Sequence, residues 1–280
     1  MLLEWGGERL RDLPWRRTRD PWAVLVSEVM AQSTRVDRVV PYYEALLRRF
    51  PEPAVCAAVP TAEVVRLWAG LGYNRRAVNL HRCATELVAR HGGTVPASLD
   101  ALVALPGVGP YTARAVLAFA FEHPVGVVDT NVGRVLARWA GRSLRRAEAQ
   151  AMADALVPEP RVWDWNQAIM ELGATVCRRR QPACPRCPVR ATCAWQASGR
   201  TSPDPAEGSA GVGQPQGRFE GSDRQARGRL VDVLRCRPVR LAEVPYVVGW
   251  PDQPARAARI AESLVADGLA IRRGDTLDLA

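Results

Sequence analysis

The 280-residue chain contains no lysine, so all 38 of its basic residues are arginines. Because no side-chain amine is available, catalysis through a lysine Schiff base is excluded. No apolar run approaches the roughly 20 residues of a membrane helix, and membrane insertion is not expected. The N-terminus also lacks the apolar stretch of a secretory signal, which predicts a cytoplasmic protein.

The net charge and the cysteine content indicate which kind of partner and which kind of protein to expect. With 29 acidic residues the net charge is +9, which favours a polyanionic partner, and nucleic acid before a membrane surface. The hydrophobic content of 48% is enough for a well-developed core. The seven cysteines are an odd number with four crowded together, which argues against a secreted disulfide scaffold.

Three regions differ in composition. Residues 1–197 show apolar spacing of helical period with short connections, which predicts an all-α fold. Residues 198–222 are rich in Gly, Pro and Ser and predict a flexible linker. Residues 223–280 combine helical patterns at 224–235 and 254–268 with a strand–turn–strand ending, which predicts a small winged-helix-like α+β domain.

Four clustered cysteines are spaced C-x6-C-x2-C-x5-C: Cys177, Cys184, Cys187 and Cys193. Four thiolates this close can hold either a zinc ion or a [4Fe–4S] cluster. Zinc sites usually use two short C-x2-4-C pairs, whereas only the middle pair here has that spacing. The longer outer gaps favour the iron–sulfur cluster. The other three cysteines are isolated and are interpreted as small hydrophobic residues.

A Pro-Gly-Val-Gly-Pro turn separates two predicted helices at 98–105 and 110–121. Gly107 and Gly109 let backbone amides approach a ligand closely, and the N-terminus of the second helix favours an anion. In a basic protein this turn predicts contact with a DNA phosphate, without base readout. An ordinary helix–helix connection is the alternative.

Two carboxylates could divide acid and electrostatic roles. Glu28 lies in a helix that is apolar nearly all round, and burial would raise its pKa as suits a general acid. Asp129 precedes a helix starting near Asn131, where amide donors would keep it ionised. Cleavage of a glycosidic bond needs such a protonated and ionised pair. An arginine salt bridge for Glu28 and a plain helix cap for Asp129 are the alternatives.

The segments SEVMAQST, GLGYN, LPGVGPYTA and VVDTN, together with the cysteine spacing, resemble the helix–hairpin–helix DNA glycosylases, and most closely those of the MutY type. The resemblance covers roughly residues 9–197. It implies a six-helix lobe over about 20–130 and a second lobe of 1–19 with 131–197, which holds a [4Fe–4S] cluster on the four clustered cysteines. It also implies a bacterial, nucleoid-associated monomer that removes adenine mispaired with 8-oxoguanine or guanine in double-stranded DNA.

The same resemblance assigns catalytic roles. Glu28 would protonate adenine at N7, Asp129 would stabilise the sugar cation, and Asn131 would help to position that site. Tyr111 stands where lyase relatives carry their Schiff-base lysine, so hydrolysis without lyase activity is expected.

Further residues are implied at the DNA interface. Tyr73 would wedge into the duplex, and Gln167 would lie near the edge of the target base. The remaining positions border the base pocket or face the DNA: Trp15, Arg16, Ala31, Gln32, Ser33, Gly107 and Gly109. Core packing is an equal alternative for Trp15.

Three positions depart from the family pattern. Ala31 and Ser33 replace the Leu and Gln of the usual LQQT, and Asn74 stands where an aromatic residue is usual. Residues 223–280 are also too few for the Nudix-like domain that reads 8-oxoguanine in many relatives. Two alternatives therefore stay open: a related glycosylase that excises thymine, uracil or hypoxanthine, and a non-catalytic iron–sulfur DNA-binding protein.

Overall fold

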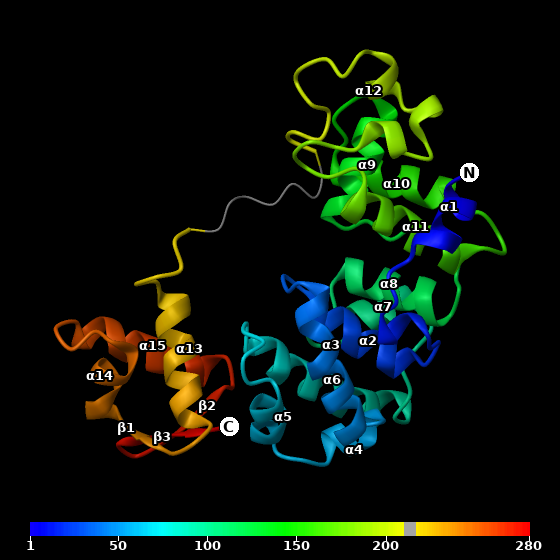
Figure 1. Cartoon of the computed structure of the whole chain (residues 1–280). Coiled ribbons are helices and arrows are strands. Elements are labelled where there is room, and N and C mark those ends of the chain that lie inside the picture. Colours follow the sequence, from blue (N-terminus) through cyan, green and yellow to red (C-terminus); the bar gives the residue numbers. More distant parts are fainter. Residues whose placement is uncertain (210–216) are drawn as a thin grey trace. The chain divides into compact units, whose positions relative to one another are not determined.

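The computed structural model describes residues 1–209 and 217–280, which form two compact units (Figure 1). The first unit comprises 1–24, 97–100 and the described part of 109–215, and the second comprises 25–96, 101–108 and the described part of 216–280. Both are mainly helical, as the apolar spacing predicts. Within the described ranges no helix is long and apolar enough to cross a membrane.

The first unit contains most of the N-terminal segment and the cysteine region. Its helical elements are α1 (Leu2–Arg9), η1 (Pro14–Arg16), α8 (Pro110–Ala120), α9 (Thr130–Ala140), α10 (Arg146–Leu156), α11 (Val162–Thr175), η2 (Cys184–Arg186), η3 (Arg190–Thr192) and α12 (Ala194–Ala197). Helix α2 (Pro21–Ala31) begins here and continues into the second unit. Helix α8 groups with this unit and packs on α11, whereas the predicted boundary placed it in the other lobe.

Two glycines let pairs of helices in the first unit pack closely. A Cβ on Gly6 of α1 would lie 2.6 Å from Cβ of Ala168 on α11, so the missing side chain lets the two helices touch. Likewise, a Cβ on Gly173 would lie 2.7 Å from Cβ of Asn131 on α9. Helix α11 therefore lies between α1 and α9 and buries Ala168, Ile169 and Leu172 in the core.

Residues 203–209 do not behave as the flexible linker that their composition predicts. Asp204 pairs with Arg138 of α9 at 2.5 Å, and Ala206 and Ser209 are buried. The Ser209 hydroxyl accepts the backbone N–H of Leu144 at 3.1 Å. An ion pair and a hydrogen bond thus hold this segment against the first unit. Composition alone could not predict these contacts. The predicted linker positions 210–216 lie outside the described residues.

The second unit begins with a helical group around a large apolar core. Its helices are the remainder of α2, then α3 (Val36–Arg49), α4 (Pro53–Ala57), α5 (Thr61–Leu67), α6 (Arg75–His91) and α7 (Leu99–Val103), the last shared with the first unit. Helix α6 packs on both α4 and α5. Trp68, Phe50, Leu80 and Leu87 are almost completely buried and form its centre.

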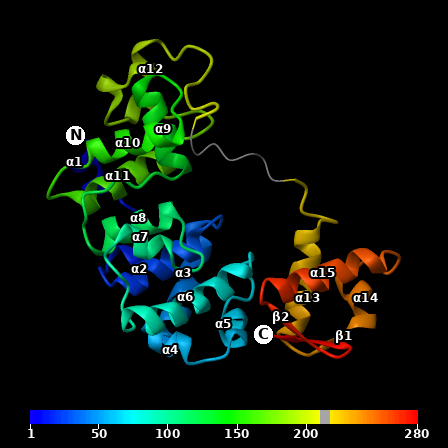
Figure 2. The ribbon, with the colours of Figure 1, turned by 180° about the vertical axis from the view of Figure 1, so that it is seen from behind.

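The C-terminal part of the second unit is a small α+β domain (Figure 2). It contains α13 (Asp223–Leu234), β1 (Val239–Arg240), η4 (Leu241–Glu243), α14 (Val244–Val248), α15 (Pro254–Ala266), β2 (Ala270–Arg273) and β3 (Thr276–Leu279). The antiparallel sheet has the order β1-β3-β2, with Ala270 opposite Leu279 and Val239 opposite Leu277. The order of helices and the β2–β3 wing agree with the predicted winged-helix-like element. Strand β1 was not predicted, because a strand of two residues is too short to show the alternation of apolar and polar side chains.

Candidate active site, DNA-contact loops and cysteine pocket

Asp129 caps the N-terminus of α9, as predicted. Its Oδ1 accepts the backbone N–H groups of Asn131 at 2.8 Å and of Val132 at 2.7 Å. Its Oδ2 accepts the Asn131 side-chain amide at 3.0 Å. Three donors therefore hold the carboxylate in one orientation, which is what a residue that stabilises a developing positive charge requires.

Burial acts on the pKa of Asp129 in the opposite direction to its hydrogen bonds. Burial raises the pKa of this carboxyl above its ordinary value, and the hydrogen bonds from Val132 and Asn131 lower it only in part. The amide donors are visible in the sequence pattern, but the loss of water around the group is not.

Arg134 is a positioning residue that the sequence pattern did not reveal. It is buried on α9, and its Nη2 donates to Asn131 Oδ1 at 2.8 Å and to the carbonyl of Gly173 at 2.7 Å. Its Nε donates to the carbonyl of Cys177 at 2.7 Å. Arg134 thus connects the first clustered cysteine with the amide that orients Asp129. The sequence does place Arg134 three residues after Asn131 on one helix, where the two side chains can meet. Many other arginines in this chain have a polar residue at the same spacing, so the spacing does not single out Arg134.

The contact between Gly173 and Asn131 gives a testable prediction. Gly173→Ala should destabilise the protein by about 1–3 kcal/mol, because the new methyl group would force α11 and α9 apart. Gly7→Ala in α1 is the matched control, since a Cβ there meets no atom within 4 Å. The free energy of unfolding from urea denaturation measures both, and equal stability of Gly173→Ala and the wild type would contradict the packing role.

The other two proposed catalytic residues, Glu28 and Tyr111, belong to different units. Glu28 lies on α2 in the second unit and is 8% exposed, so the predicted burial is confirmed. Around it on the same helix, Leu25, Val26 and Met30 are fully buried. Tyr111 is the second residue of α8 in the first unit and is half-buried.

Two loops of the second unit hold residues expected at the DNA interface, of which Tyr73 is expected to enter the duplex. Ser33 and Tyr73 are both exposed and have positive φ values of 55° and 49°, in the left-handed region that disfavours side chains. Backbone strain of this kind collects at functional sites. Gln32, beside Ser33, donates from Nε2 to the carbonyl of Gly107 at 3.5 Å.

Buried Arg76 ties these two loops together. Its Nη1 donates to the carbonyls of Met30 and Gln32, each at 2.6 Å. Its Nη2 donates to Thr34 Oγ1 and to the carbonyl of Gly72, each at 3.0 Å. Burial lowers the pKa of Arg76 to about 10, which leaves it charged at neutral pH. Arg76 was not singled out from the sequence, because nothing in a helical pattern distinguishes a buried arginine from a solvated one.

The two glycines of the hairpin have different surroundings. Gly107 has a φ of +78°, and a Cβ there would lie 2.7 Å from Cβ of Asn79, so glycine is required by backbone and packing together. Gly109 caps α8, and a Cβ placed on it would meet no atom within 4 Å. The backbone at Gly109 can therefore be approached closely, as a phosphate contact requires.

The residues expected near the target base form a buried ionic group in the first unit. Arg16 donates from Nε to Gln167 Oε1 at 2.7 Å and from Nη2 to Glu171 Oε2 at 2.9 Å. Arg11 donates to the other oxygen of Glu171, which is fully buried, at 2.7 Å. Arg16 and Gln167 thus lie together, and Arg16 fixes the direction of the Gln167 amide. Trp15 is half-buried in η1.

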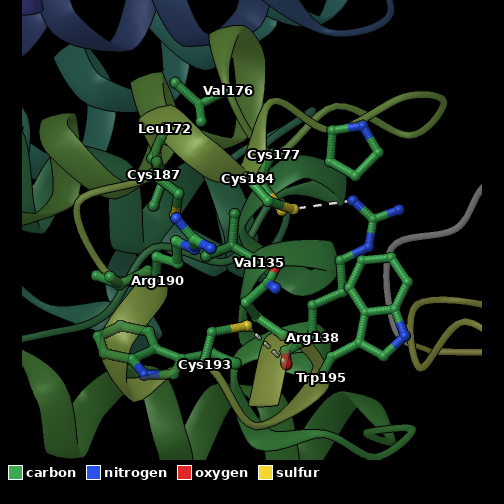
Figure 3. Close-up of a pocket in the computed structure, with 14 residues that line it drawn as sticks. Val135, Arg138, Leu172, Val176, Cys177, Cys184, Cys187, Arg190, Cys193 and Trp195 are labelled. Atoms are coloured by element: carbon green, nitrogen blue, oxygen red, sulfur yellow. Dashed lines mark hydrogen bonds between the residues drawn. The ribbon is translucent and has the colours of Figure 1, made fainter. Parts of the chain in front are cut away.

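The four clustered cysteines line one pocket at the end of α11 (Figure 3). Arg138 lies beside them, and its Nη1 donates to Cys177 Sγ at 3.4 Å. Cys193 Sγ donates to the carbonyl of Arg138 at 3.3 Å. Burial raises the pKa of the Cys187 thiol to about 11 and also raises the pKa of Cys177. A metal group that binds here must therefore displace protons from these thiols.

The chemistry of these four side chains fits a metal group. The four thiols line one pocket together with Val135, Leu172 and Trp195, which are apolar. Four thiolates around one pocket can hold either a zinc ion or an iron–sulfur cluster.

Comparison with known proteins identifies the family. Residues 26–159 match the model of HhH-GPD superfamily base excision DNA repair proteins. An adenine DNA glycosylase of Mycobacterium tuberculosis is 44% identical over 283 residues, which cover 98% of this chain and 90% of the relative. The chain belongs to the adenine DNA glycosylase family. The resemblance noted from the motifs is confirmed.

Solved structures agree with this assignment of fold. A thermostable thymine-DNA glycosylase superposes with a TM-score of 0.66 at 29% identity, covering 70% of this chain and 94% of that one. A non-covalent endonuclease III–DNA complex superposes with a TM-score of 0.60 at 25% identity, covering 71% and 94%. The helix–hairpin–helix glycosylase fold is thus confirmed.

Proposed function

We propose that this protein is a monofunctional DNA glycosylase that hydrolyses the N-glycosidic bond of adenine mispaired with 8-oxoguanine or guanine. The proposal rests on the half-buried Asp129 carboxylate, which three hydrogen bonds hold at the start of α9. The near full-length relation to adenine DNA glycosylases supports adenine as the base. Double-stranded DNA in the bacterial cytoplasm would be the substrate, with one protein monomer acting on each site.

The chemistry follows from the roles of a few groups. Glu28 gives its proton to N7 of adenine, and the C1′–N9 bond breaks with its electron pair passing to the base. Asp129 stabilises the resulting cation at C1′, and Asn131 keeps its carboxylate in place. Water then adds to C1′, and the proton that it loses passes to the Glu28 carboxylate. Tyr111 cannot form a Schiff base and the chain has no lysine, so strand cleavage should not follow.

Single-turnover base excision on labelled duplexes tests this proposal. The panel holds adenine opposite 8-oxoguanine, adenine opposite guanine, thymine opposite guanine, uracil opposite guanine, and hypoxanthine pairs. We expect adenine release, with strand breaks only after alkali. Release of thymine would favour the second candidate, which the structural similarity to a thymine-DNA glycosylase motivates. Strand breaks before alkali would contradict the monofunctional assignment.

The pH dependence of excision tests the role of Asp129. Because burial raises its pKa, lowering the pH protonates this carboxyl earlier than an ordinary aspartate. Excision should therefore be lost on the acid side at a pH above the ordinary aspartate pKa of about 3.9. Asn131→Ala removes a donor that favours the charged form, and should move this limb to still higher pH. Single-turnover rates against pH measure both, and an unmoved acid limb in Asn131→Ala would contradict the assignment.

We also propose that Cys177, Cys184, Cys187 and Cys193 hold a [4Fe–4S] cluster. Such a cluster would cross-link the loop after α11 and stabilise the fold in which Arg134 and Arg138 are held. The purified protein should be brown, with broad absorption near roughly 400 nm. Cys187→Ser should lose this absorption and lower the melting temperature, whereas Cys236→Ser, at an exposed isolated cysteine, should change neither. A colourless protein with stoichiometric zinc would contradict the proposal.

A further inference from the structure

One arginine of the C-terminal domain reaches the loop that carries Tyr73. Arg235, the residue that follows α13, donates from Nη2 to Asn74 Oδ1 at 2.8 Å and from Nε to the carbonyl of Val65 at 3.1 Å. Its side chain is only 8% exposed, burial lowers its pKa, and within its own domain it pairs with Asp232. Arg235 therefore connects the C-terminal domain with both sides of the segment that joins α5 to α6.

Further contacts hold the same domain against α6. Arg75, the first residue of α6, pairs with Asp267 at 3.4 Å. The next residue, Gly268, has a φ of +73°, and a Cβ placed on it would lie 3.5 Å from Cγ1 of Val78. The turn after α15 therefore packs on α6 one helical turn beyond Arg75. Arg235 is thus one of several contacts between the domain and this helix, and its hydrogen bonds belong to a packed interface.

The loop between α5 and α6 has a backbone that needs support from outside. Gly70, Gly72 and Tyr73 have positive φ values of 89°, 79° and 49°. For a tyrosine this left-handed conformation is unfavourable, and it persists only where the surrounding structure holds it. The Tyr73 side chain is nevertheless 45% exposed, so the contacts that hold the backbone must come largely from its neighbours in the chain.

Two arginines hold the chain on the two sides of Tyr73. Arg76 donates to the carbonyl of Gly72, the residue before it, at 3.0 Å, and Arg235 donates to Asn74, the residue after it, at 2.8 Å. Asn74 is the N-cap residue of α6, where an asparagine side chain commonly accepts a helix amide. Within the described residues its side chain makes no such cap bond. The Asn74 oxygen therefore serves the contact with the C-terminal domain instead of its own helix.

We infer that Arg235 is a positioning residue for excision, which holds the Tyr73 loop through Asn74 in the conformation that meets the DNA. The C-terminal domain thereby presets this loop before DNA binds, and less conformational entropy is lost when the duplex is opened. Arg235 acts on the reaction only through the loop. The inference rests on the proposed function, since that function supplies the duplex that Tyr73 is expected to enter.

Arg235→Met tests this role, because methionine keeps an apolar stem but has no group that donates to Asn74. Single-turnover adenine excision should fall by about tenfold or more, the equivalent of one lost hydrogen bond to a charged group. Arg237→Met is the matched control. Arg237 lies two residues further on, is exposed and pairs with Glu243 in the same domain, so its replacement should leave the rate unchanged. Excision by Arg235→Met at the wild-type rate would overturn the inference.

A Tyr73→Ala background distinguishes positioning of the loop from general stabilisation of the domain. If Arg235 acts through the Tyr73 ring, Arg235→Met should slow Tyr73→Ala by a much smaller factor than it slows the wild type. An equal factor in both backgrounds would overturn the inference.

Duplex opening gives a second readout that does not depend on bond cleavage. The fluorescence of 2-aminopurine placed beside the mispaired adenine rises when the neighbouring bases unstack. At saturating protein, where affinity no longer matters, this rise should be slower with Arg235→Met than with the wild type. An equal rate of rise, or no rise with the wild type, would overturn the inference.

Variants of Asn74 answer the same question if Arg235→Met does not fold. Asn74→Ala removes the acceptor without removing a helix cap, and it should slow excision as Arg235→Met does. Asn74→Asp keeps an oxygen for Arg235 and should restore the wild-type rate. A wild-type rate in Asn74→Ala, or equally slow excision by Asn74→Asp, would overturn the inference.

These outcomes are separate from the proposed function. If the wild type fails to release adenine, that function is wrong, and the rate of the 2-aminopurine rise still decides the role of Arg235. If the wild type releases adenine and Arg235→Met does so equally fast, only the role of Arg235 is wrong.

Discussion

Glu28→Gln should abolish adenine excision while binding to mispaired DNA persists. Glutamine has nearly the same shape but has no acidic proton to give, so the loss should be about 10²–10⁴-fold, the range contributed by general acids. Single-turnover excision measures the rate, and fluorescence anisotropy measures the affinity. Because the side chain is 8% exposed on a helix with fully buried neighbours, the nearly isosteric change should leave the fold intact.

Glu44→Gln is the matched control for this variant. Glu44 is an exposed carboxylate on α3 in the same unit, and its replacement should leave the excision rate unchanged. Excision by Glu28→Gln at the wild-type rate would exclude Glu28 as the proton donor. It would then favour the alternative interpretation of Glu28 as a purely structural carboxylate.

Arg76→Met should both destabilise the protein and impair excision. The change removes the guanidinium that donates to the carbonyls of Met30 and Gln32 and to the Thr34 hydroxyl, at a cost of about 3 kcal/mol or more. Excision should fall as well, because the Gln32 and Tyr73 loops lose their common anchor. Urea unfolding gives the stability, and single-turnover kinetics at a temperature where the variant stays folded give the rate.

Arg90→Met separates this effect from the loss of a positive charge. Arg90 lies on the same helix, α6, but it is exposed and pairs with Glu86 one turn away. Its replacement should change stability by less than about 0.5 kcal/mol. Equal stability of Arg76→Met and Arg90→Met would show that the buried hydrogen bonds of Arg76 contribute little.

The sequence predicted a site residue best where the local conformation depends only on neighbouring residues in the chain. Asp129 was predicted as a cap because a short polar side chain precedes a helix, and cap geometry is set within four residues. The burial of Glu28 followed from the apolar residues around it on α2. The raised pKa of Asp129 was not predicted, because it depends on how residues distant in sequence exclude water from the carboxyl.

Long-range arginine contacts could not be predicted at all. With 38 arginines and no lysine, neither type nor spacing distinguishes Arg76, Arg134 or Arg235 from solvated surface residues. Each of these arginines donates hydrogen bonds to carbonyls that are distant in the sequence and come together only in the folded chain. The departure at Asn74, noted in the sequence as a break in the motif, became interpretable only when Arg235 was found beside it.

The anchored segment 203–209 also determines where the chain can be divided. Arg138 is 2% exposed, and burial lowers its pKa, but the hydrogen bonds and charges of Asp204 and Cys177 together outweigh burial and set the pKa above its ordinary value. A truncation after residue 197 would delete Asp204 and leave this guanidinium with the carbonyls of Arg178 and Arg179 as its oxygen partners beside the cysteine pocket. A shortened catalytic fragment should therefore end after Ser209, so that the carboxylate that neutralises Arg138 is retained.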